Sequence, residues 1–414
     1  MNKGQRSRVA AGACAPRLVS IACRVSLQVM LKEILLLSCC AALQAAESGS
    51  TLGNLRFLDG RLALNPYLGV GGDYDSNPNA RSDPPNDQWR GYQRYGSDAS
   101  WALTTHDQVS GTAEVRPTWS SRAENRPDWL YLAALREHHQ GPHSTVDAAL
   151  TAQRDDAYDS QTGIRQLIDT MGGSFDAARD TPGLHLQAGA AGSRIDYRRV
   201  DAGVSERDSV IGSTYVEGGP RFGRLTVRPR VTVEAIRYDS DAYQDSDGVI
   251  STIGVLYRAP DLIDWHCDVG WQWRRYRTSA TDAADRTSSP NGSLRVEWQV
   301  DSRTTITSSA DCGLEDNVLA QSSLVIGARA GVSYRIDRRT RGSLSSGWLR
   351  SEGIDLPPGA TGELRNTVHV ALGLDRTLRP GLVLTLSAQA ERTWARIAED
   401  FMRVSGAGEL IARF

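Results

Sequence analysis

Residues 225–235 read LTVRPRVTVEA and alternate between two kinds of side chain. One series is apolar and consists of Leu225, Val227, Pro229, Val231, Val233 and Ala235. The other is polar or charged and consists of Thr226, Arg228, Arg230, Thr232 and Glu234. A period of two places successive side chains on opposite faces of a β-strand. The pattern therefore predicts a strand that lies between an apolar environment and a polar one.

The same alternation recurs along the chain from about residue 63, and it has the strand length of about 10 residues that suits a tilted membrane strand. The segments are 63–72, 97–104, 108–119, 129–136, 144–153, 164–177, 184–192, 208–218, 225–237, 249–257, 263–274, 293–300, 304–311, 324–336, 342–349, 365–374, 382–391 and 402–414. We therefore expect an all-β fold, a transmembrane antiparallel up-and-down β-barrel of about 18 strands, with 16 as the alternative count.

The composition agrees with a barrel and excludes a helical membrane protein. Of the 414 residues 40% are hydrophobic, and the formal net charge is -2. A membrane helix needs a run of about 20 apolar residues, whereas barrel strands alternate and so have the average composition of a soluble chain.

The predicted connections alternate between short and long, which outer-membrane barrels require of their periplasmic turns and outer loops. The long connections are 73–96, 154–163, 193–207, 238–248, 275–292, 312–323 and 350–364. The short ones include 105–107, 181–183, 219–224, 258–262, 301–303, 337–341 and 375–381. The connection 137–143 is the exception, because it is long for a periplasmic turn.

Aromatic residues lie near the predicted strand ends. Trp265 starts its strand, Trp271 and Trp273 end it, and all three share the apolar face. Eight residues at about 3.3 Å, tilted near 40°, rise about 20 Å, close to the height of an apolar band. We interpret these residues as aromatic girdles, with ordinary strand preference as the alternative.

The chain ends on an alternating strand whose last residue is Phe414. Its apolar series is Met402, Val404, Gly406, Gly408, Leu410, Ala412 and Phe414. A terminal aromatic residue after such a series resembles the C-terminal signature of bacterial outer-membrane proteins. The resemblance implies that Phe414 is an assembly signal recognised by the barrel assembly machinery.

The N-terminal region predicts export. Residues 31–46, LKEILLLSCCAALQAA, combine a lysine, a short apolar core and small residues, as a secretory signal does. We divide the chain into an N-terminal extension and signal peptide (1–46), a short periplasmic segment (47–62) and the barrel (63–414). Met30 is an alternative start. The expected location is the outer membrane of a Gram-negative cell, so the barrel's surroundings are outer-membrane lipid.

The polar series predicts a charged lumen. Facing the bilayer midplane would cost each arginine about 2–4 kcal/mol, so these residues are expected to point inward. The candidate pore-lining residues are Arg228, Arg230, Glu234, Asp264, Asp268, Arg274, Arg295, Glu297, Arg329, Arg335, Glu391 and Arg403. They serve either as a selectivity lining or only as the hydrated, charge-balanced interior that any wide barrel needs.

Three other clusters predict no metal or cofactor site. Asp239, Asp241, Asp245 and Asp247 offer oxygen ligands in an outer loop but lack the EF-hand spacing, and a solvated loop is preferred. His138, His139 and His143 lie near one connection without a further ligand. Cys267 and Cys312 fall on non-adjacent predicted strands, so no disulfide is expected.

No enzyme is expected either. His266 and His369 fall on the inward series, but neither lies in a catalytic motif, and no Walker or dinucleotide fingerprint is present. Nucleic acid is not an expected partner.

Residues 65–78 read NPYLGVGGDYDSNP. A glycine-rich strand that runs into a Tyr-Asp-x-Asn-Pro turn resembles the opening of a family of outer-membrane β-barrel porins associated with exopolysaccharide and capsule gene clusters. The motif covers these 14 residues, and the length and barrel pattern match over the whole chain. The resemblance implies passage of solutes or polysaccharide across the outer membrane.

The leading hypothesis is a porin-like channel for passive passage of small hydrophilic solutes or saccharides. The alternatives are a component of exopolysaccharide or capsule export or assembly, an outer-membrane enzyme, and a structural barrel with adhesive loops. The oligomeric state is left unassigned.

Overall fold

The computed structural model describes residues 55–77, 87–121, 128–158, 165–198, 208–240, 245–259, 262–277, 286–315, 322–354, 364–396 and 400–414. The predicted signal peptide and residues 47–54 lie outside the described residues, so the proposed division at 46 stays a prediction. In the described part of the chain no helix has the length and apolar run that a membrane-crossing helix requires, which carries no information about a β-barrel.

The described residues form nineteen strands. These are β1 (Leu55–Phe57), β2 (Leu62–Asp75), β3 (Gln88–Ala102), β4 (Asp107–Ser120), β5 (Asp128–Gln140), β6 (Ser144–Tyr158), β7 (Arg165–Asp180), β8 (Leu184–Tyr197), β9 (Ser209–Phe222), β10 (Leu225–Tyr238), β11 (Ser246–Ala259), β12 (Ile263–Tyr276), β13 (Arg286–Gln299), β14 (Thr304–Glu315), β15 (Ser322–Arg335), β16 (Thr340–Ile354), β17 (Leu364–Arg379), β18 (Leu382–Ala395) and β19 (Phe401–Arg413).

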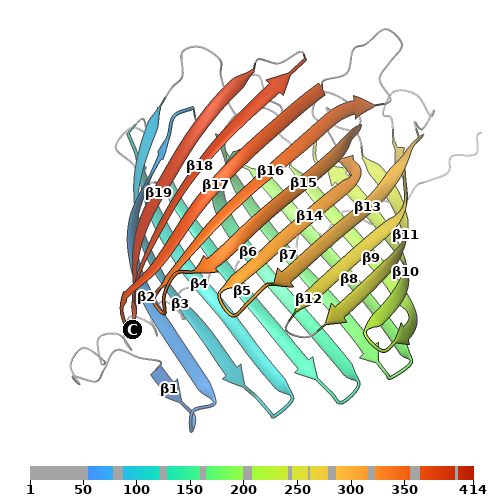
Figure 1. The fold of residues 1–414 in the computed structure, drawn as a ribbon, viewed down its shortest axis with the longest axis horizontal. Coiled ribbons are helices and arrows are strands. Elements are labelled where there is room, and N and C mark those ends of the chain that lie inside the picture. Colours follow the sequence, from blue (N-terminus) through green and yellow to red (C-terminus); the bar gives the residue numbers. More distant parts are fainter. Residues whose placement is uncertain are drawn as a thin grey trace, which may run out of the picture. The chain divides into compact units, whose positions relative to one another are not determined.

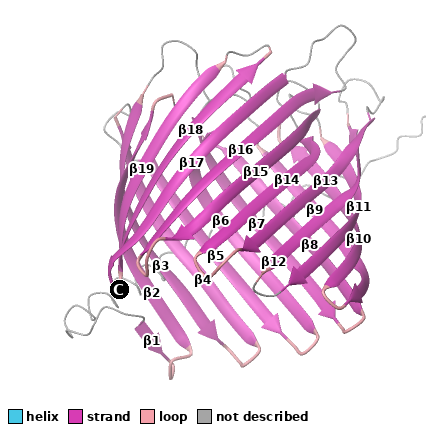
Figure 2. Cartoon of the chain, in the orientation of Figure 1, coloured by secondary structure: helices cyan, strands magenta, loops and turns pink. Residues whose placement is uncertain are grey.

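The long strands β2 to β19 form a closed antiparallel barrel, drawn in Figures 1 and 2. Each pairs with its neighbours in the sequence, and β19 pairs with β2 from Ser405↔Asp75 to Arg413↔Tyr67. The prediction of an up-and-down barrel of about 18 strands is confirmed. The additional strand β1 is three residues long and pairs with the first residues of β2.

The connections sort by length between the two ends of the barrel, as predicted. At the short-turn end two to four residues join consecutive strands, and at the other end the connections are longer. Gly223 and Gly381 have φ of 61° and 78° in two of the tightest turns, where a side chain would strain the backbone. Asp301 accepts bonds from the amides of Arg303 and Thr304, both at 2.7 Å, and so ties a third turn together.

Most of the predicted connections were too long, because the strands extend further than predicted, and two cases show this most clearly. The loop predicted at 73–96 is shorter, because β2 continues to Asp75 and β3 already begins at Gln88. The long connection predicted at 137–143 shrinks to residues 141–143, because β5 continues to Gln140. The physical reason is that backbone pairing continues past the apolar belt, where the alternation of hydrophobicity that guided the prediction fades.

The register divides the side chains of the barrel into two faces. The outer face carries exposed apolar residues on nearly every strand, including Val70, Leu150, Val231, Val269 and Leu372. Exposed tryptophans border this belt, and the rings of Tyr257 and Trp265 stack across one short turn with their centroids 6.0 Å apart. The predicted pairing of aromatic residues at strand ends is therefore present on this face.

The inner face is polar and contains glycines over which larger side chains lie. The ring of Tyr67 on β2 fills the space where Gly96 of β3 would carry a Cβ, and its hydroxyl donates to Glu114 on β4 at 2.7 Å. Tyr215 of β9 covers Gly189 of β8 in the same way. A glycine on one strand thus allows a side chain to reach across to the next strand but one.

The seam between the first and last barrel strands is closed by an ion pair in addition to the ladder. Arg403 of β19 donates from Nε to both oxygens of Asp75 at 3.0 Å, and its Nη2 lies 2.5 Å from Oδ2. Asp75 is buried and also accepts the amide of Asn77 at 3.1 Å. At the opposite end of the seam the amide of Phe414 donates to the Pro66 carbonyl at 2.9 Å.

Replacing Asp75 by alanine is expected to destabilise the barrel, because the Arg403 side chain, which is only 15% exposed, then loses this carboxylate. Removing one member of a buried pair typically costs about 3–5 kcal/mol. Urea unfolding of the purified barrel, followed by tryptophan fluorescence, measures the loss. Asp98→Ala is the matched control, since its partner Arg413 is half exposed and 3.2 Å away, and exposed pairs contribute at most about 1 kcal/mol. Equal losses in the two variants would contradict the role given to the seam.

Candidate functional site: the inner face of the barrel

The register places the twelve predicted pore-lining residues on one face of the sheet, opposite the apolar belt. One continuous row of inward-facing residues runs from β12 to β19, and each member is the direct cross-strand partner of the next. It consists of His266, Arg295, Ser309, Arg329, Gly347, His369, Glu391 and Arg403. Residues that are more than 130 positions apart in the sequence therefore share one level of the inner face.

On β9 to β12 the charged residues form a compact network centred on Glu217. Arg228 lies 2.9 Å and Arg230 3.6 Å from the Glu217 carboxylate, and His185 of β8 lies 3.1 Å from it. The Glu217 side chain is only 3% exposed. Arg230 also stacks over the ring of Tyr215, 3.9 Å from its centroid. Two of the predicted residues thus depend on a carboxylate that the sequence reasoning did not single out.

The remaining predicted residues of this wall have nearby partners as well. Arg228 extends over Gly254 of β11 to the imidazole of His266, 2.5 Å away, and His266 lies 2.6 Å from Asp268. Arg274 is buried and lies 3.3 Å from Glu234. Asp264 lies at the short-turn end, 3.4 Å from Arg258. Opposite charges therefore alternate along this wall and neutralise one another.

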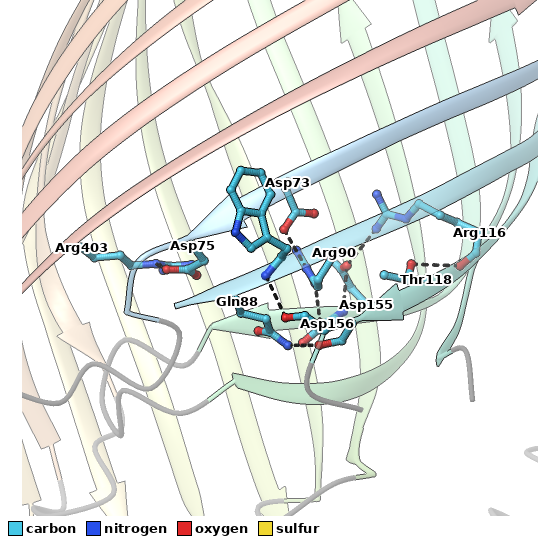
Figure 3. Close-up of polar contacts among 12 residues, drawn as sticks. Asp73, Asp75, Gln88, Arg90, Arg116, Thr118, Asp155, Asp156 and Arg403 are labelled. Atoms are coloured by element: carbon cyan, nitrogen blue, oxygen red, sulfur yellow. Dashed lines mark hydrogen bonds and ion pairs between the residues drawn. The ribbon is translucent and has the colours of Figure 1, made fainter. Parts of the chain in front are cut away.

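A second network joins residues of β19, β2, β3, β4 and β6, close to the longer connections. Figure 3 shows Arg90 between the carboxylates of Asp73 and Asp156, at 2.8 and 2.5 Å, with Arg403 on Asp75 beside it. Arg116 lies 3.4 Å from Asp155 in the same view. The arginines of this network are thus bridged to carboxylates of several strands.

Further along β3, Arg94 bridges two acidic residues on strands that are not adjacent. Its Nε lies 3.0 Å from Glu114 and its Nη1 3.1 Å from Glu409. Gly69 of β2, which lies between them in the register, leaves the space for this contact.

Sequence reasoning missed several members of these two networks, among them Asp73, Arg90, Arg94, Glu114 and Glu217. Three of them, Asp73, Arg90 and Arg94, lie in the region 73–96 that was predicted as a loop. The alternation of Trp89, Gln93 and Tyr95 with Arg90 and Arg94 was the available signal. Glu217 lay in a predicted strand, but only the register shows that it faces two arginines.

On β13 to β16 the predicted residues have fewer partners. Within the described ranges Arg295, Glu297, Arg329 and Arg335 form no ion pair with one another or with their neighbours. Glu391 lies directly opposite Arg403 in the register. This side of the inner face therefore carries charges without ion-pair partners among the described residues.

The clusters set aside in the sequence also have partners. Asp239 and Asp247 lie 2.6 and 2.8 Å from Arg194 and Arg277, so arginines neutralise the acidic loop, while Asp241 lies outside the described residues. His138 and His139 contact separate carboxylates. Among the described residues no group of three or more His, Cys, Asp or Glu side chains could hold a metal ion. Cys267 and Cys312 are both free.

Among the described residues, His266 does not lie between a hydroxyl nucleophile and a carboxylate. Ser293 donates to Asp268 at 3.2 Å, and Asp268 in turn contacts His266. The carboxylate therefore lies between the hydroxyl and the imidazole, whereas activation of a serine requires the imidazole in that place. His369 packs over Gly347 of β16.

Comparison with known proteins shows that the fold of this chain is similar to that of solved outer-membrane barrels. No family model matches the sequence, and no curated protein matches it. The solved structure of the outer membrane protein OpdK of Pseudomonas aeruginosa is similar with a TM-score of 0.48 and 13% identity, over 85% of this chain and 99% of that chain. OpdQ of the same organism gives 0.48 and 10%, over 86% and 100%. The FrpB iron transporter of Neisseria meningitidis gives 0.45 and 8%, over 84% and 81%. Likenesses at this level leave the activity of the chain open.

Replacing Glu217 by alanine is expected to lower the free energy of unfolding by about 3–5 kcal/mol, because Arg228 and Arg230 lose a buried common partner and repel each other. The measurement is urea unfolding in detergent. Glu297→Ala is the matched control, since this exposed glutamate on the same face has no ion pair within the described ranges and should change stability by less than about 0.5 kcal/mol. A Glu217 variant as stable as the control would show that the network contributes nothing.

Proposed function

We propose that the chain is a channel-forming β-barrel of the outer membrane that allows passive passage of small hydrophilic solutes or saccharides. The observation that carries the proposal is the closed barrel of strands β2 to β19 with an apolar outer face and a charged inner face. Barrels of 16–18 strands are wide enough to leave an aqueous channel. A smaller barrel would be filled by its own side chains.

The outer face supports a membrane location. An exposed belt of valine, leucine and tryptophan would be a liability in water, but it is the surface that a bilayer requires. Closure of the sheet leaves no unpaired strand edge, which is the condition for a β-structure to cross lipid. By the usual orientation the short-turn end, where β19 ends, faces the periplasm.

The inner face supports passage. Charged side chains from many strands point into the enclosed space, and every described strand except β1 belongs to the wall of the barrel. Among the described residues no element folds into the lumen as a plug. A hydrated, charge-lined interior of this kind favours hydrophilic solutes over apolar ones.

Purified protein inserted into a planar lipid bilayer is expected to show stepwise increases of conductance, because each inserted barrel adds one water-filled path. Liposomes that contain the protein should swell in small sugars and cease to swell above a size limit. Heat-denatured protein is the control. A correctly folded preparation that never conducts would rule out an open channel and favour a structural barrel.

Phe414 is proposed to act as an assembly signal for the barrel assembly machinery. Phe414→Ser is expected to reduce the amount of folded barrel in the outer membrane severalfold while it leaves the spontaneous refolding yield in detergent nearly unchanged. Fractionation of cells and heat-modified migration on gels measure the two quantities. Arg413→Ser is the adjacent control. If both substitutions leave membrane insertion unchanged, Phe414 has no such role.

Participation in exopolysaccharide or capsule export is the alternative function, and the opening motif at 65–78 is its support. The structure gives part of that motif a role in closing the barrel, through Asp75 and Asn77 at the seam. A role in the fold explains the motif without export. Deletion of the gene with loss of surface polymer, restored by the intact gene, would favour export over general passage.

A further inference from the structure

The hairpin formed by β15 and β16 concentrates positive charge at the short-turn end of the barrel. Residues 329–341 read RAGVSYRIDRRTR and contain five arginines and one acidic residue. We call Arg329, Arg335, Arg338, Arg339 and Arg341 the arginine hairpin. All five are exposed in the structure. No other run of thirteen residues in the sequence carries five arginines.

The single carboxylate within this stretch, Asp337, accepts hydrogen bonds from other residues of the turn. Asp337 accepts the amide of Arg339 at 2.6 Å and the hydroxyl of Thr340 at 3.1 Å. These bonds favour the ionised form and lower the pKa of Asp337. The next nearest acid in the register, Asp375 opposite Arg341, accepts the hydroxyl of Thr385 at 2.9 Å. Neither carboxylate forms an ion pair with the arginines.

The lack of ion pairs distinguishes this hairpin from the two charged networks of the inner face. Arg90, Arg94, Arg228 and Arg403 each lie within 3.1 Å of a carboxylate. Within the described ranges the five arginines of the hairpin form no ion pair. In this part of the chain, as far as it is described, no direct ion pair therefore neutralises their charge.

Two of these arginines face each other directly. Arg335 of β15 and Arg341 of β16 are cross-strand partners, and the parity of both strands points them to the inner face. Like charges in opposed positions destabilise a sheet. Among the described residues the side-chain hydrogen bond of this pair runs from Arg341 Nε to the hydroxyl of Ser333 at 2.6 Å. A bound anion would relieve this repulsion.

The wall beyond this pair leads into the barrel and is lined with hydroxyl groups. Arg329 lies on the same inner face of β15, six residues from Arg335. Between and beside them the register places short hydroxyl side chains from three strands, which are Thr307, Ser309, Ser333, Ser343 and Ser345. Arginines separated by hydroxyl groups thus extend from the mouth toward the middle of the inner face.

We propose that the arginine hairpin is a binding site at the channel mouth for hydroxylated solutes that bear carboxylates, such as sugar acids. The proposal rests on the channel function proposed above and names a substrate class for it. The guanidinium group binds a carboxylate through two parallel hydrogen bonds. The serine and threonine hydroxyls supply donors and acceptors for the hydroxyl groups of the same solute.

The position on the inner face favours a solute over a docking protein. Arg329 and Arg335 are reached from within the barrel, so their ligand must enter the lumen. Arg338 and Arg339 in the turn raise the local concentration of anions at the entrance. On the neighbouring wall the carboxylates of Asp264 on β12 and Glu297 on β13 are directly opposed and mark the edge of the site.

The test measures binding of trigalacturonate to the detergent-solubilised full barrel by isothermal titration calorimetry. The variants are Arg335→Gln combined with Arg341→Gln, and separately Arg338→Gln combined with Arg339→Gln in the exposed turn. Arg258→Gln is the matched control, because this arginine lies at the same end, is 70% exposed and already contacts Asp264. Heat-modified migration on gels confirms that each variant is folded.

Trigalacturonate is expected to bind the unaltered barrel more tightly than neutral maltotriose. The Arg335/Arg341 variant should lose about tenfold or more in affinity, as expected for loss of charge-assisted bonds, and the control should lose less than about twofold. The turn variant should show a smaller loss of affinity than the Arg335/Arg341 variant. Retained binding in both double variants would overturn the proposal.

Two further outcomes separate the site from the channel. Binding that depends on Arg335 and Arg341 in a barrel without conductance would support the site and contradict the proposed channel. Conductance with trigalacturonate binding that no variant alters would contradict the site and leave the channel standing. Equal affinity for triglutamate would show that charge alone is recognised, which overturns the assignment to sugar acids.

Discussion

The pairing of β19 with β2 is the constraint on which the rest of the structure depends. An open sheet would present two rows of unpaired amides and carbonyls, and each such group is costly to bury in an apolar environment. Closure satisfies them all and fixes the register of every strand between. The ion pair of Arg403 with Asp75 and the bond from Phe414 to Pro66 secure the two ends of this seam. The number of strands then sets the width of the enclosed space.

Closure also determines how charge is distributed on the inner face. Because the register is continuous round the barrel, an arginine on one strand meets acids from strands that lie far away in the sequence. Arg94 bridges Glu114 and Glu409 in this way. Small residues on the intervening strand make these contacts sterically accessible, as Gly69 does beneath Arg94. Most of the inner face is thereby neutralised by the protein.

The β15–β16 hairpin departs from that balance, and the departure has a structural origin. Its single acidic residue, Asp337, is used to hold a tight turn and cannot pair with the arginines beside it. Antiparallel pairing then brings Arg335 and Arg341 face to face. Inner arginines such as Arg94 and Arg228 lie within 3.0 Å of a carboxylate, whereas in the described part of the chain Arg335 and Arg341 form no ion pair. The proposed binding site therefore lies where like charges are opposed across two strands, and such locally unfavourable contacts are common at binding sites.

The sequence by itself determined the fold class and the face on which each residue of a strand lies, and it indicated about 18 long strands with 16 as the alternative. These properties depend on a period of two along the chain, which is a local pattern that any stretch such as 225–235 displays. It also determined that connections alternate in length. It underestimated the extent of β3 and β5, because strands continue beyond the apolar belt where hydrophobicity no longer alternates.

Only the tertiary structure decided which charges are partners. Arg228 and Glu234 were equally good lumen candidates, yet one joins a network around Glu217 and the other pairs with Arg274. Ion pairs between strands depend on register and on the glycines between them, and neither is visible from the composition of a single strand. For the same reason the sequence showed Arg335 as one inward arginine among several, whereas the register showed it opposite Arg341 and without a carboxylate.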